Sequence, residues 1–331
     1  MAGAANRRGW LTRDIALPRA VLLTGALLAA SLAGLAGEVW WVFDLASHFP
    51  LHYAALLALL APWLWWQRWR RLALLALMVA LVQGGRAWQW DENAPAAAAA
   101  SPVLRVFLLN LARGNSAHRA VLEAIAASRA DVVVLLEVSR HWATALQALH
   151  GDYPYHLVES AEDNFGIALY SRHPLSTLEL RHPGPWALAS ILARMTLEDA
   201  HLTVYASHPP PPLGGAMSAA RDAQLAAIAG ELATLPGPIL LAGDLNATPW
   251  SAAFAPLRTA GLRDSSPGFG YQGSWPAWLR GWGIPLDHLL VSADITVLER
   301  RLGPAVGSDH LPVLAILRLA APGDRPVSVP P

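Results

Sequence analysis

The sequence predicts an α/β (α+β) domain preceded by N-terminal transmembrane helices, and three observations support this prediction. The first 90 residues contain three apolar runs with few charges. The rest of the chain contains short runs rich in Val, Ile, Leu and Ala that are bounded by Gly, Pro or polar residues, as buried strands are. Two stretches, residues 121–128 and 218–235, are predicted to be helices on the outside of the domain.

The apolar runs are candidates for membrane spans. Residues 20–37 carry no charge, and at ~1.5 Å per residue this run approaches the roughly 20 residues that cross a bilayer. Residues 51–66 form the second run and residues 72–82 a third, which is short for a span. Aromatic side chains flank the runs, as expected for an interfacial belt: Trp40, Trp41, Trp63, Trp65, Trp66, Trp69 and Trp88. We expect residues 1–91 to form an anchor of two to three transmembrane helices, with a cleaved signal peptide as the alternative for the first run.

The placement of arginine predicts the orientation of this anchor. Four Arg residues precede the first run and three lie between the second and third, whereas residues 38–50 contain no Lys or Arg. The positive-inside rule places the N-terminus and residues 67–71 in the cytoplasm. Three spans would put the following domain outside the cytoplasm, and two would leave it inside.

The remaining chain divides into a linker, one domain and a tail. Residues 92–101 are rich in Ala and are expected to be a linker. Residues 102–320 have the length of one globular domain, and residues 321–331 are rich in Pro and are expected to be disordered. The chain has no Cys, which excludes disulfides and thiolate metal sites.

Polar side chains follow most of the strand-like runs. Taken singly, a buried Asp or His is usually structural, but a set placed at the ends of several strands can converge in one cleft. Carboxylate and amide oxygens are ligands suited to Mg²⁺ or Mn²⁺. In chain order the candidates are Asn110, Glu137, His208, Asp244, Asn246, Asp287, Asp309 and His310.

Two motifs that contain these residues resemble a known family. GDLNATPW at 243–250 and GSDHLPV at 307–313 are similar to motifs of the endonuclease/exonuclease/phosphatase superfamily, with support from NFGIALYSRHPL at 164–175. The resemblance covers roughly residues 103–320. It implies a four-layer α/β/β/α sandwich of two mostly antiparallel sheets, with the site at one end. It also implies a divalent-metal-dependent phosphoesterase.

The resemblance implies a metal centre built on Glu137. Asp309 would help to hold the metal, and Asn110 would add an amide oxygen or a donor and contact the substrate. Many members have Gln before the metal-binding Glu, where this chain has Leu136, and others have Asp where it has Ala112. One essential Mg²⁺ (or Mn²⁺) is therefore expected rather than two.

The resemblance also implies the catalytic roles. Asp244 would orient or deprotonate the attacking water, and Asn246 would steer the phosphate or that water. His310 would contact a phosphoryl oxygen, with Asp287 accepting a hydrogen bond from its other ring nitrogen. His208 would assist the leaving group.

Structural explanations compete with some of these roles. Asp287 could cap a strand end, and His208 could belong to a stiff loop before four prolines. Trp275 is expected to stack on the substrate, although Trp is also a common core residue. The neighbouring His288 is expected to be a packing residue. Arg221 and Gln224 lie three apart on one helix face, where they could brace the His208 loop or face solvent.

Charge and resemblance leave the substrate class open. Residues 101–320 contain 15 Arg and 18 Asp plus Glu, a net charge of −3, with no basic cluster of the kind that holds long duplexes. The leading hypothesis is a membrane-anchored phosphodiesterase of endonuclease type in a bacterial inner membrane, with several spans and an extracytoplasmic catalytic domain. A sphingomyelinase-like hydrolase or a lipid or inositol phosphate phosphatase is the first alternative. A non-catalytic membrane-binding module is the second. The expected partners are nucleic acid or a phospholipid headgroup, and the lipid bilayer; no protein partner is implied.

Overall fold

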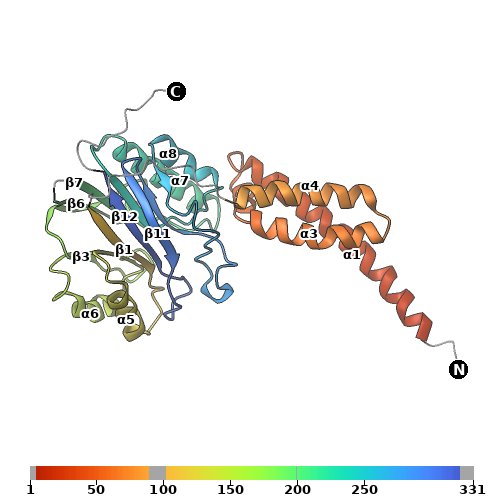
Figure 1. The fold of residues 1–331 in the computed structure, drawn as a ribbon, viewed down its shortest axis with the longest axis horizontal. Helices are drawn as coiled ribbons and strands as arrows, with labels where there is room; N and C mark the ends of the chain where they lie inside the picture. Colours follow the sequence, from red (N-terminus) through yellow and green to blue (C-terminus); the bar gives the residue numbers. More distant parts are fainter. Residues whose placement is uncertain (1–4, 89–101, 199, 321–331) are drawn as a thin grey trace. The chain divides into compact units, whose positions relative to one another are not determined.

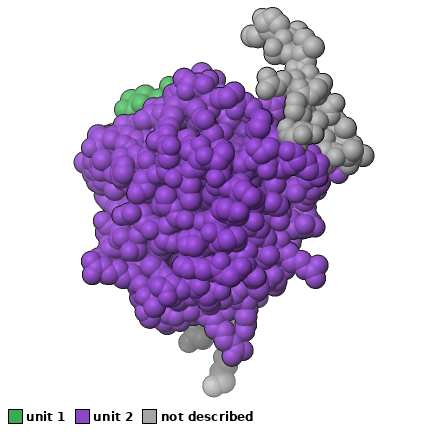
Figure 2. All heavy atoms as spheres, turned by 90° about the vertical axis from the view of Figure 1, so that its left-hand side faces the viewer, with its two compact units in different colours: residues 1–89, 250–252 green, residues 90–249, 253–331 purple. Residues whose placement is uncertain are grey.

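The computed structural model describes residues 5–88, 102–198 and 200–320. The chain divides into two compact units, residues 1–89 with 250–252 and residues 90–249 with 253–331 (Figure 2). The expected linker and tail, residues 92–101 and 321–331, lie outside the described residues. The two units are described separately below.

The first unit is helical. Its elements are α1 (Ala5–Ala33), η1 (Gly34–Ala36), α2 (Trp41–Ser47), α3 (Pro50–Trp66) and α4 (Arg70–Ala87). Helices α3 and α4 lie side by side (Figure 1). Small residues allow this close packing, because Ala61, Ala76 and Ala80 are buried together with Leu57 and Tyr53. The second and third apolar runs of the sequence lie within α3 and α4, and the first lies within α1 and η1 apart from its last residue, Gly37.

One described helical stretch in this unit, Leu17–Ala36, is long and apolar enough to cross a membrane, with a mean hydropathy of 1.7. Helices α2 and α3 meet the same criterion only when taken together, and they are bent by 66° at the break between them. Helix α3 begins with Pro50 at its first position, where proline costs no hydrogen bond.

The second unit contains two six-stranded sheets. The first has the order β11-β12-β1-β2-β4-β3 and the second the order β5-β6-β7-β8-β10-β9. Pairs β1–β2 and β7–β8 are parallel and the other described pairs are antiparallel. The strands are β1 (Val103–Asn110), β2 (Val132–Leu136), β3 (Tyr155–Glu159), β4 (Ile167–Ser171), β5 (Leu175–Arg181), β6 (Ser190–Leu197), β7 (Ala200–Ser207), β8 (Ile239–Asp244), β9 (Arg263–Asp264), β10 (Asp287–Val291), β11 (Ile295–Leu302) and β12 (Val313–Leu319).

Side-chain alternation along the strands produces four layers. In β1, Leu104, Val106 and Leu108 belong to the core between the sheets, whereas Phe107 and Leu109 belong to a second core against helices. Successive side chains of a strand point to opposite faces, so a central strand buried on both faces is apolar throughout. The predicted α/β/β/α sandwich of mostly antiparallel sheets is confirmed.

Helices cover the outer face of each sheet. The first sheet carries α5 (His118–Ser128) and α6 (Arg140–Ala145), and the second carries α7 (Gly215–Leu232) and α8 (Ala255–Thr259) (Figure 1). The two helices expected from the sequence are present, and each begins three residues earlier than predicted.

Strand direction brings the candidate residues to one end of the sandwich. Because β1 and β2 are parallel, Asn110 at the end of β1 and Glu137 directly after β2 lie at the same edge of the first sheet. Asp244 ends β8 and lies opposite Asp287, which begins the antiparallel strand β10.

Candidate active site

His310 and Asp287 form the central pair of the site. The ring Nδ1 of His310 lies 2.7 Å from Oδ2 of Asp287, and Nε2 lies 3.6 Å from Oδ2 of Asp244. The backbone N–H of His310 donates to Ser308 Oγ, which in turn donates to the carbonyl oxygen of Asn110. These two hydrogen bonds attach the turn of residues 308–310 to the end of β1. The pairing of His310 with Asp287 that the sequence predicted is present.

The surrounding carboxylates favour a charged imidazole at His310. Burial alone would lower its pKa, but the charges of Asp287 and Asp244 and the hydrogen bond that His310 donates to Asp287 raise the pKa of His310 to about 10. The pKa of Asp244 is shifted the other way: burial raises it, and the charges of His310 and His208 lower it well below the ordinary range. These shifts favour a cationic His310 beside an anionic Asp244.

Asn110 connects Asp244 to Glu137. Its Nδ2 group donates to Oε1 of Glu137 and to Oδ2 of Asp244, each at 3.1 Å. Its Oδ1 accepts from the backbone N–H of Ala112 at 3.0 Å. Asn110 therefore acts here as a donor between two carboxylates, the second of the two options that the sequence left open.

Glu137 occupies a strained backbone position. Its φ of +57° lies in the left-handed region, which residues other than glycine adopt rarely and often at functional sites. Oε2 accepts from the backbone N–H of Arg113 at 2.9 Å. Gly166 allows its own backbone to lie close to the turn after β2, because a Cβ at position 166 would lie 2.1 Å from the carbonyl oxygen of Val138.

His208 closes another side of the site. Its Nε2 lies 3.6 Å from Oδ2 of Asp244, and its Nδ1 is buried without a hydrogen-bond partner among the described residues. Burial lowers the pKa of His208, but the hydrogen bond and charge of Asp244 and the charge of Glu137 raise it overall. The side chain is only 3% exposed, so His208 is buried beside Asp244.

Asn246 holds two loops of the site together. Its backbone N–H donates to Oδ1 of Asp244, and its Nδ2 donates to the carbonyl oxygen of Pro209, both at 3.0 Å. The buried Arg221 donates to the Asn246 carbonyl oxygen, and Gln224 donates to Ser207 Oγ. Gln224 braces the loop that carries His208, as the sequence suggested. A solvent-facing Arg221 was the wrong alternative, because its side chain is 1% exposed.

Trp275 lies beside the central pair. Its ring centroid is 6.5 Å from that of His310, and its Nε1 donates to Oδ2 of Asp309 at 3.1 Å. The residue is 36% exposed, so it is not part of the core. This position leaves the ring available to a substrate.

A second buried polar network behind the site was not predicted from the sequence. His288 Nδ1 lies 2.6 Å from Asp264 Oδ2, and His288 Nε2 lies 2.9 Å from the carbonyl oxygen of Ala247. The buried Arg300 contacts the carbonyl oxygen of Asp287. The expectation that His288 only packs was incomplete. The sequence signal that could have indicated this network is the pair Asp287-His288 inside an otherwise apolar run.

The comparisons with known proteins agree with this geometry. Residues 104–310, most of the second unit, match the model of a protein family described as "Endonuclease/Exonuclease/phosphatase family". The chain belongs to the endonuclease/exonuclease/phosphatase family. Members of this family are metal-dependent hydrolases of phosphoester bonds, and the chain is such a hydrolase. No curated protein matches it.

Solved structures of other family enzymes share the fold. TDP2 from D. rerio, humanized by 14 mutations, is 18% identical, with a TM-score of 0.57 over 65% of this chain and 99% of that chain. The human Nocturnin catalytic domain is 18% identical, with a TM-score of 0.53 over 70% of this chain and 100% of that chain. An endonuclease/exonuclease/phosphatase from Beutenbergia cavernae is 20% identical, with a TM-score of 0.52 over 66% and 72%.

The site has the donor set for the divalent metal that this family uses. Glu137 and Asp244 are carboxylates bridged by a single amide, and Oδ1 of Asp287 is buried without a hydrogen-bond partner among the described residues. Ligand atoms of Asp244, Asp287 and His310 lie within 4.8 Å of one another. His310 and Asp287 already share a hydrogen bond, and a cationic imidazole repels a metal ion. The partly exposed carboxylate of Glu137 therefore fits a hard cation better than this cluster does.

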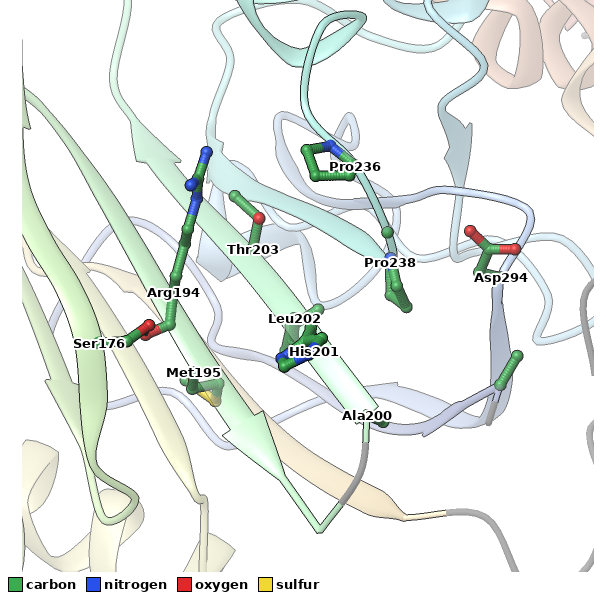
Figure 3. A pocket seen from close by; sticks show the side chains of 12 residues that line it. Ser176, Arg194, Met195, Ala200, His201, Leu202, Thr203, Pro236, Pro238 and Asp294 are labelled. Carbon is green, nitrogen blue, oxygen red and sulfur yellow. The ribbon is translucent and has the colours of Figure 1, made fainter. Parts of the chain in front are cut away.

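A cavity of about 300 Å³ lies away from these residues (Figure 3). It is lined by Arg194 of β6, His201 and Thr203 near the start of β7, and Pro238. His208 follows the opposite end of β7, so this cavity is separate from the active site.

Proposed function

We propose that this family member is a membrane-anchored phosphodiesterase that uses Mg²⁺, with Mn²⁺ as a substitute. The observation that carries the proposal is the arrangement of His310, held by Asp287, against Asp244, which Asn110 connects to Glu137. A phosphodiester resists attack because its anionic oxygens repel an incoming hydroxide, so a site must neutralise charge, activate water and stabilise the leaving group.

Asp244 and His310 would act on the reacting phosphate. Asp244 is held anionic and would orient and deprotonate the attacking water, with Asn246 steering the water or the phosphate. The His310 cation, fixed by Asp287, would donate a hydrogen bond to a phosphoryl oxygen as negative charge develops there. His208, with its partner-free Nδ1, would donate to the leaving oxygen.

Glu137 would be the principal metal ligand. Asp309 would contribute directly or through water, and Trp275 orients its carboxylate through the indole N–H. Asn110 would position the carboxylates of Glu137 and Asp244 by donating to both. When bound, the cation would neutralise the phosphate and lower the pKa of a coordinated water.

The helical unit would anchor this enzyme in a membrane. Residues 1–91 would form an anchor of two to three spans, residues 92–101 the linker, residues 102–320 the catalytic domain and residues 321–331 a tail. Large apolar side chains on the outside of the helices support this proposal, because a soluble protein seldom exposes so many of them: Leu22, Leu32, Leu59, Trp66, Leu74, Met78 and Leu81. With three spans, the arginine pattern would place the catalytic domain outside the cytoplasm.

Two substrate classes follow from the family chemistry. Nucleic acid is the first, and one fold neighbour, D. rerio TDP2, was solved with a single-strand DNA product (17% identical, TM-score 0.55). Phospholipid headgroups are the second, favoured by the exposed Trp side chains near His310. Fold alone does not choose between them.

Hydrolysis by the full-length protein tests the proposal. The substrates are bis(p-nitrophenyl) phosphate, plasmid DNA, RNA, phospholipid vesicles and inositol phosphates, each with Mg²⁺, Mn²⁺ or EDTA. We expect metal-dependent turnover that the His310→Ala variant loses. The matched control is His201→Ala, an exposed histidine at the far end of β7. Turnover that survives in His310→Ala, or that ignores EDTA, would contradict the proposal.

A further inference from the structure

Exposed large apolar side chains of the catalytic unit gather on the loops around the active site. Five of them lie on these loops: Trp186, Leu213, Trp275, Trp278 and Trp282. The others that the structure describes on this unit are Val103, Tyr155 and Leu298, which are 37–40% exposed and lie on strands. Trp278 and Leu213 are much more exposed, at 76% and 78%. Contact of these apolar side chains with water is unfavourable, so these loops are better candidates for an interaction surface than the rest of the catalytic unit.

These loops leave the sandwich at the same end as the catalytic residues. Ser207, which precedes His208, pairs with Ser190 at the start of β6. Residues 182–189 and 209–214 adjoin that pair, so Trp186 and Leu213 are carried by loops of the active-site end. The third loop, residues 275–284, begins with Trp275 beside His310. We call residues 275–284 the Trp loop.

The Trp loop is a braced structure that holds its aromatic side chains outward. Trp275 and Ile284 exchange two backbone hydrogen bonds, which close the base of the loop. The N–H of Ala277 donates to the carbonyl oxygen of Asp309 at 2.7 Å, which ties the loop to the catalytic turn. Trp278 lies in the 3₁₀ turn that follows, and exposed Arg280 has a left-handed φ of +47°. A loop braced in this way presents Trp278 without collapsing onto the core.

The chemistry of the loop matches a bilayer surface. Indole rings prefer the headgroup region of a membrane, because the ring is apolar and its N–H is polar. An exposed Arg within the same loop is attracted to anionic headgroups. The sequence of residues 101–320 contains no basic cluster of the kind that holds a long nucleic acid, whereas indole rings with a single Arg suffice for docking on a bilayer. The apolar helix Leu17–Ala36 in the same chain would keep a membrane close by.

We propose that the Trp loop, with Trp186 and Leu213, docks the catalytic unit onto the surface of an anionic phospholipid bilayer. The active site then faces the headgroups, and the ester that it hydrolyses is presented by the membrane. This inference rests on the proposed membrane anchoring and phosphodiesterase function, but its test does not depend on turnover.

Site-specific fluorescence on the full-length protein tests the docking. The chain has no Cys, so a Trp278→Cys variant can be labelled at one position with an environment-sensitive fluorophore. The matched control is Leu298→Cys, an exposed apolar position on β11. Both variants are reconstituted in vesicles of phosphatidylcholine with phosphatidylglycerol. We expect a blue-shifted emission and quenching by nitroxide-bearing lipids at position 278, and aqueous emission with iodide quenching at position 298. In vesicles of phosphatidylcholine alone, the blue shift and the quenching by nitroxide-bearing lipids at position 278 should both be smaller.

Two outcomes would overturn the docking proposal. One is a label at position 278 that behaves like the label at 298. The other is a label at 278 that becomes protected only when single-stranded DNA is added, which would assign the loop to base stacking. Hydrolysis of soluble bis(p-nitrophenyl) phosphate is measured in parallel. If the protein hydrolyses the soluble ester while the label at position 278 stays in water, the docking proposal is rejected and the proposed function stands. If the label enters the bilayer but no hydrolysis occurs, the proposed function is rejected and the docking stands.

Discussion

The carboxylate of Asp264 lies 2.6 Å from the ring Nδ1 of the buried His288, the residue that follows Asp287 of the candidate site. The other ring nitrogen of His288 lies 2.9 Å from the carbonyl oxygen of Ala247, which follows the loop that carries Asp244 and Asn246. Each ring nitrogen of His288 therefore lies within hydrogen-bond distance of an oxygen atom, one on β9 and one on the loop after β8. The His288 ring thus connects strand β10 to the loop that follows Asp244.

Removing one partner of this pair should destabilise the protein. We expect Asp264→Asn to lower the free energy of unfolding by about 1–3 kcal/mol at neutral pH, because it removes the carboxylate that lies against the His288 ring and whose charge acts on the buried Arg300. Equilibrium denaturation with urea measures the loss. The matched control is Asp152→Asn, an exposed position, which should change stability by less than about 0.5 kcal/mol.

The same pair should contribute to acid sensitivity. Burial raises the pKa of Asp264, but the charge and hydrogen bond of His288 and the charge of Arg300 lower it well below the ordinary range. A lowered pKa contributes stability above the unfolded value of ~3.9, and this stability is lost as the pH falls through the folded value. Wild-type stability should therefore fall below about pH 4 more steeply than that of Asp264→Asn. Parallel curves would show that Asp264 does not carry this dependence.

Asp287 should set the alkaline limit of activity. Because Asp287 and Asp244 raise the pKa of His310 to about 10, kcat/KM should decline only as the pH rises through about 10. In Asp287→Asn the largest raising influence is lost, so the decline should begin at lower pH. At pH 8 the variant should lose about 10²–10⁴ in rate and regain part of it at pH 6. A profile of kcat/KM against pH measures both effects, and an unmoved alkaline limb would argue that His310 does not act as the cation.

Glu137 should control the metal requirement. Loss of a residue that hydrogen-bonds a metal ligand typically weakens metal binding by about 10–100-fold. Glu137→Gln removes a charged ligand itself, so we expect it to raise the Mg²⁺ concentration for half-maximal activity by more than this factor. Glu123→Gln, on the exposed surface of α5 in an i,i+4 pair with Arg119, is the control and should leave the requirement unchanged. Metal titrations of both variants decide the point. An equal requirement in Glu137→Gln and wild type would move the metal to other residues.

Gly243 permits the close contact between β7 and β8 at the site. A Cβ at this position would lie 1.9 Å from the carbonyl oxygen of Ser207, so the two strands would have to move apart. We expect Gly243→Ala to destabilise by about 1–3 kcal/mol or more and to reduce activity, because the shift displaces His208 and Asp244. Gly230→Ala in α7 meets no atom within 4 Å and should stabilise by about 0.5–1 kcal/mol. Thermal unfolding of both variants measures the contrast.

Much of the catalytic architecture could be predicted from local sequence. Short apolar runs predicted the strands, and polar residues directly after them predicted where Asn110, Glu137 and Asp244 would stand. These predictions succeed because strand formation depends on burial patterns that repeat every two residues. The membrane anchor was predicted as two to three spans, and the structure supports one stretch of sufficient length by itself.

The sequence by itself determined the fold class and the family, and it predicted a set of candidate site residues. Only the tertiary structure decided which atoms meet: that Asn110 donates to both Glu137 and Asp244, that Arg221 is buried against the Asn246 loop, and that Asp264 pairs with His288. These contacts join residues 24 to 134 positions apart. Their geometry depends on how the two sheets pack, a relation between distant segments that no local periodicity encodes.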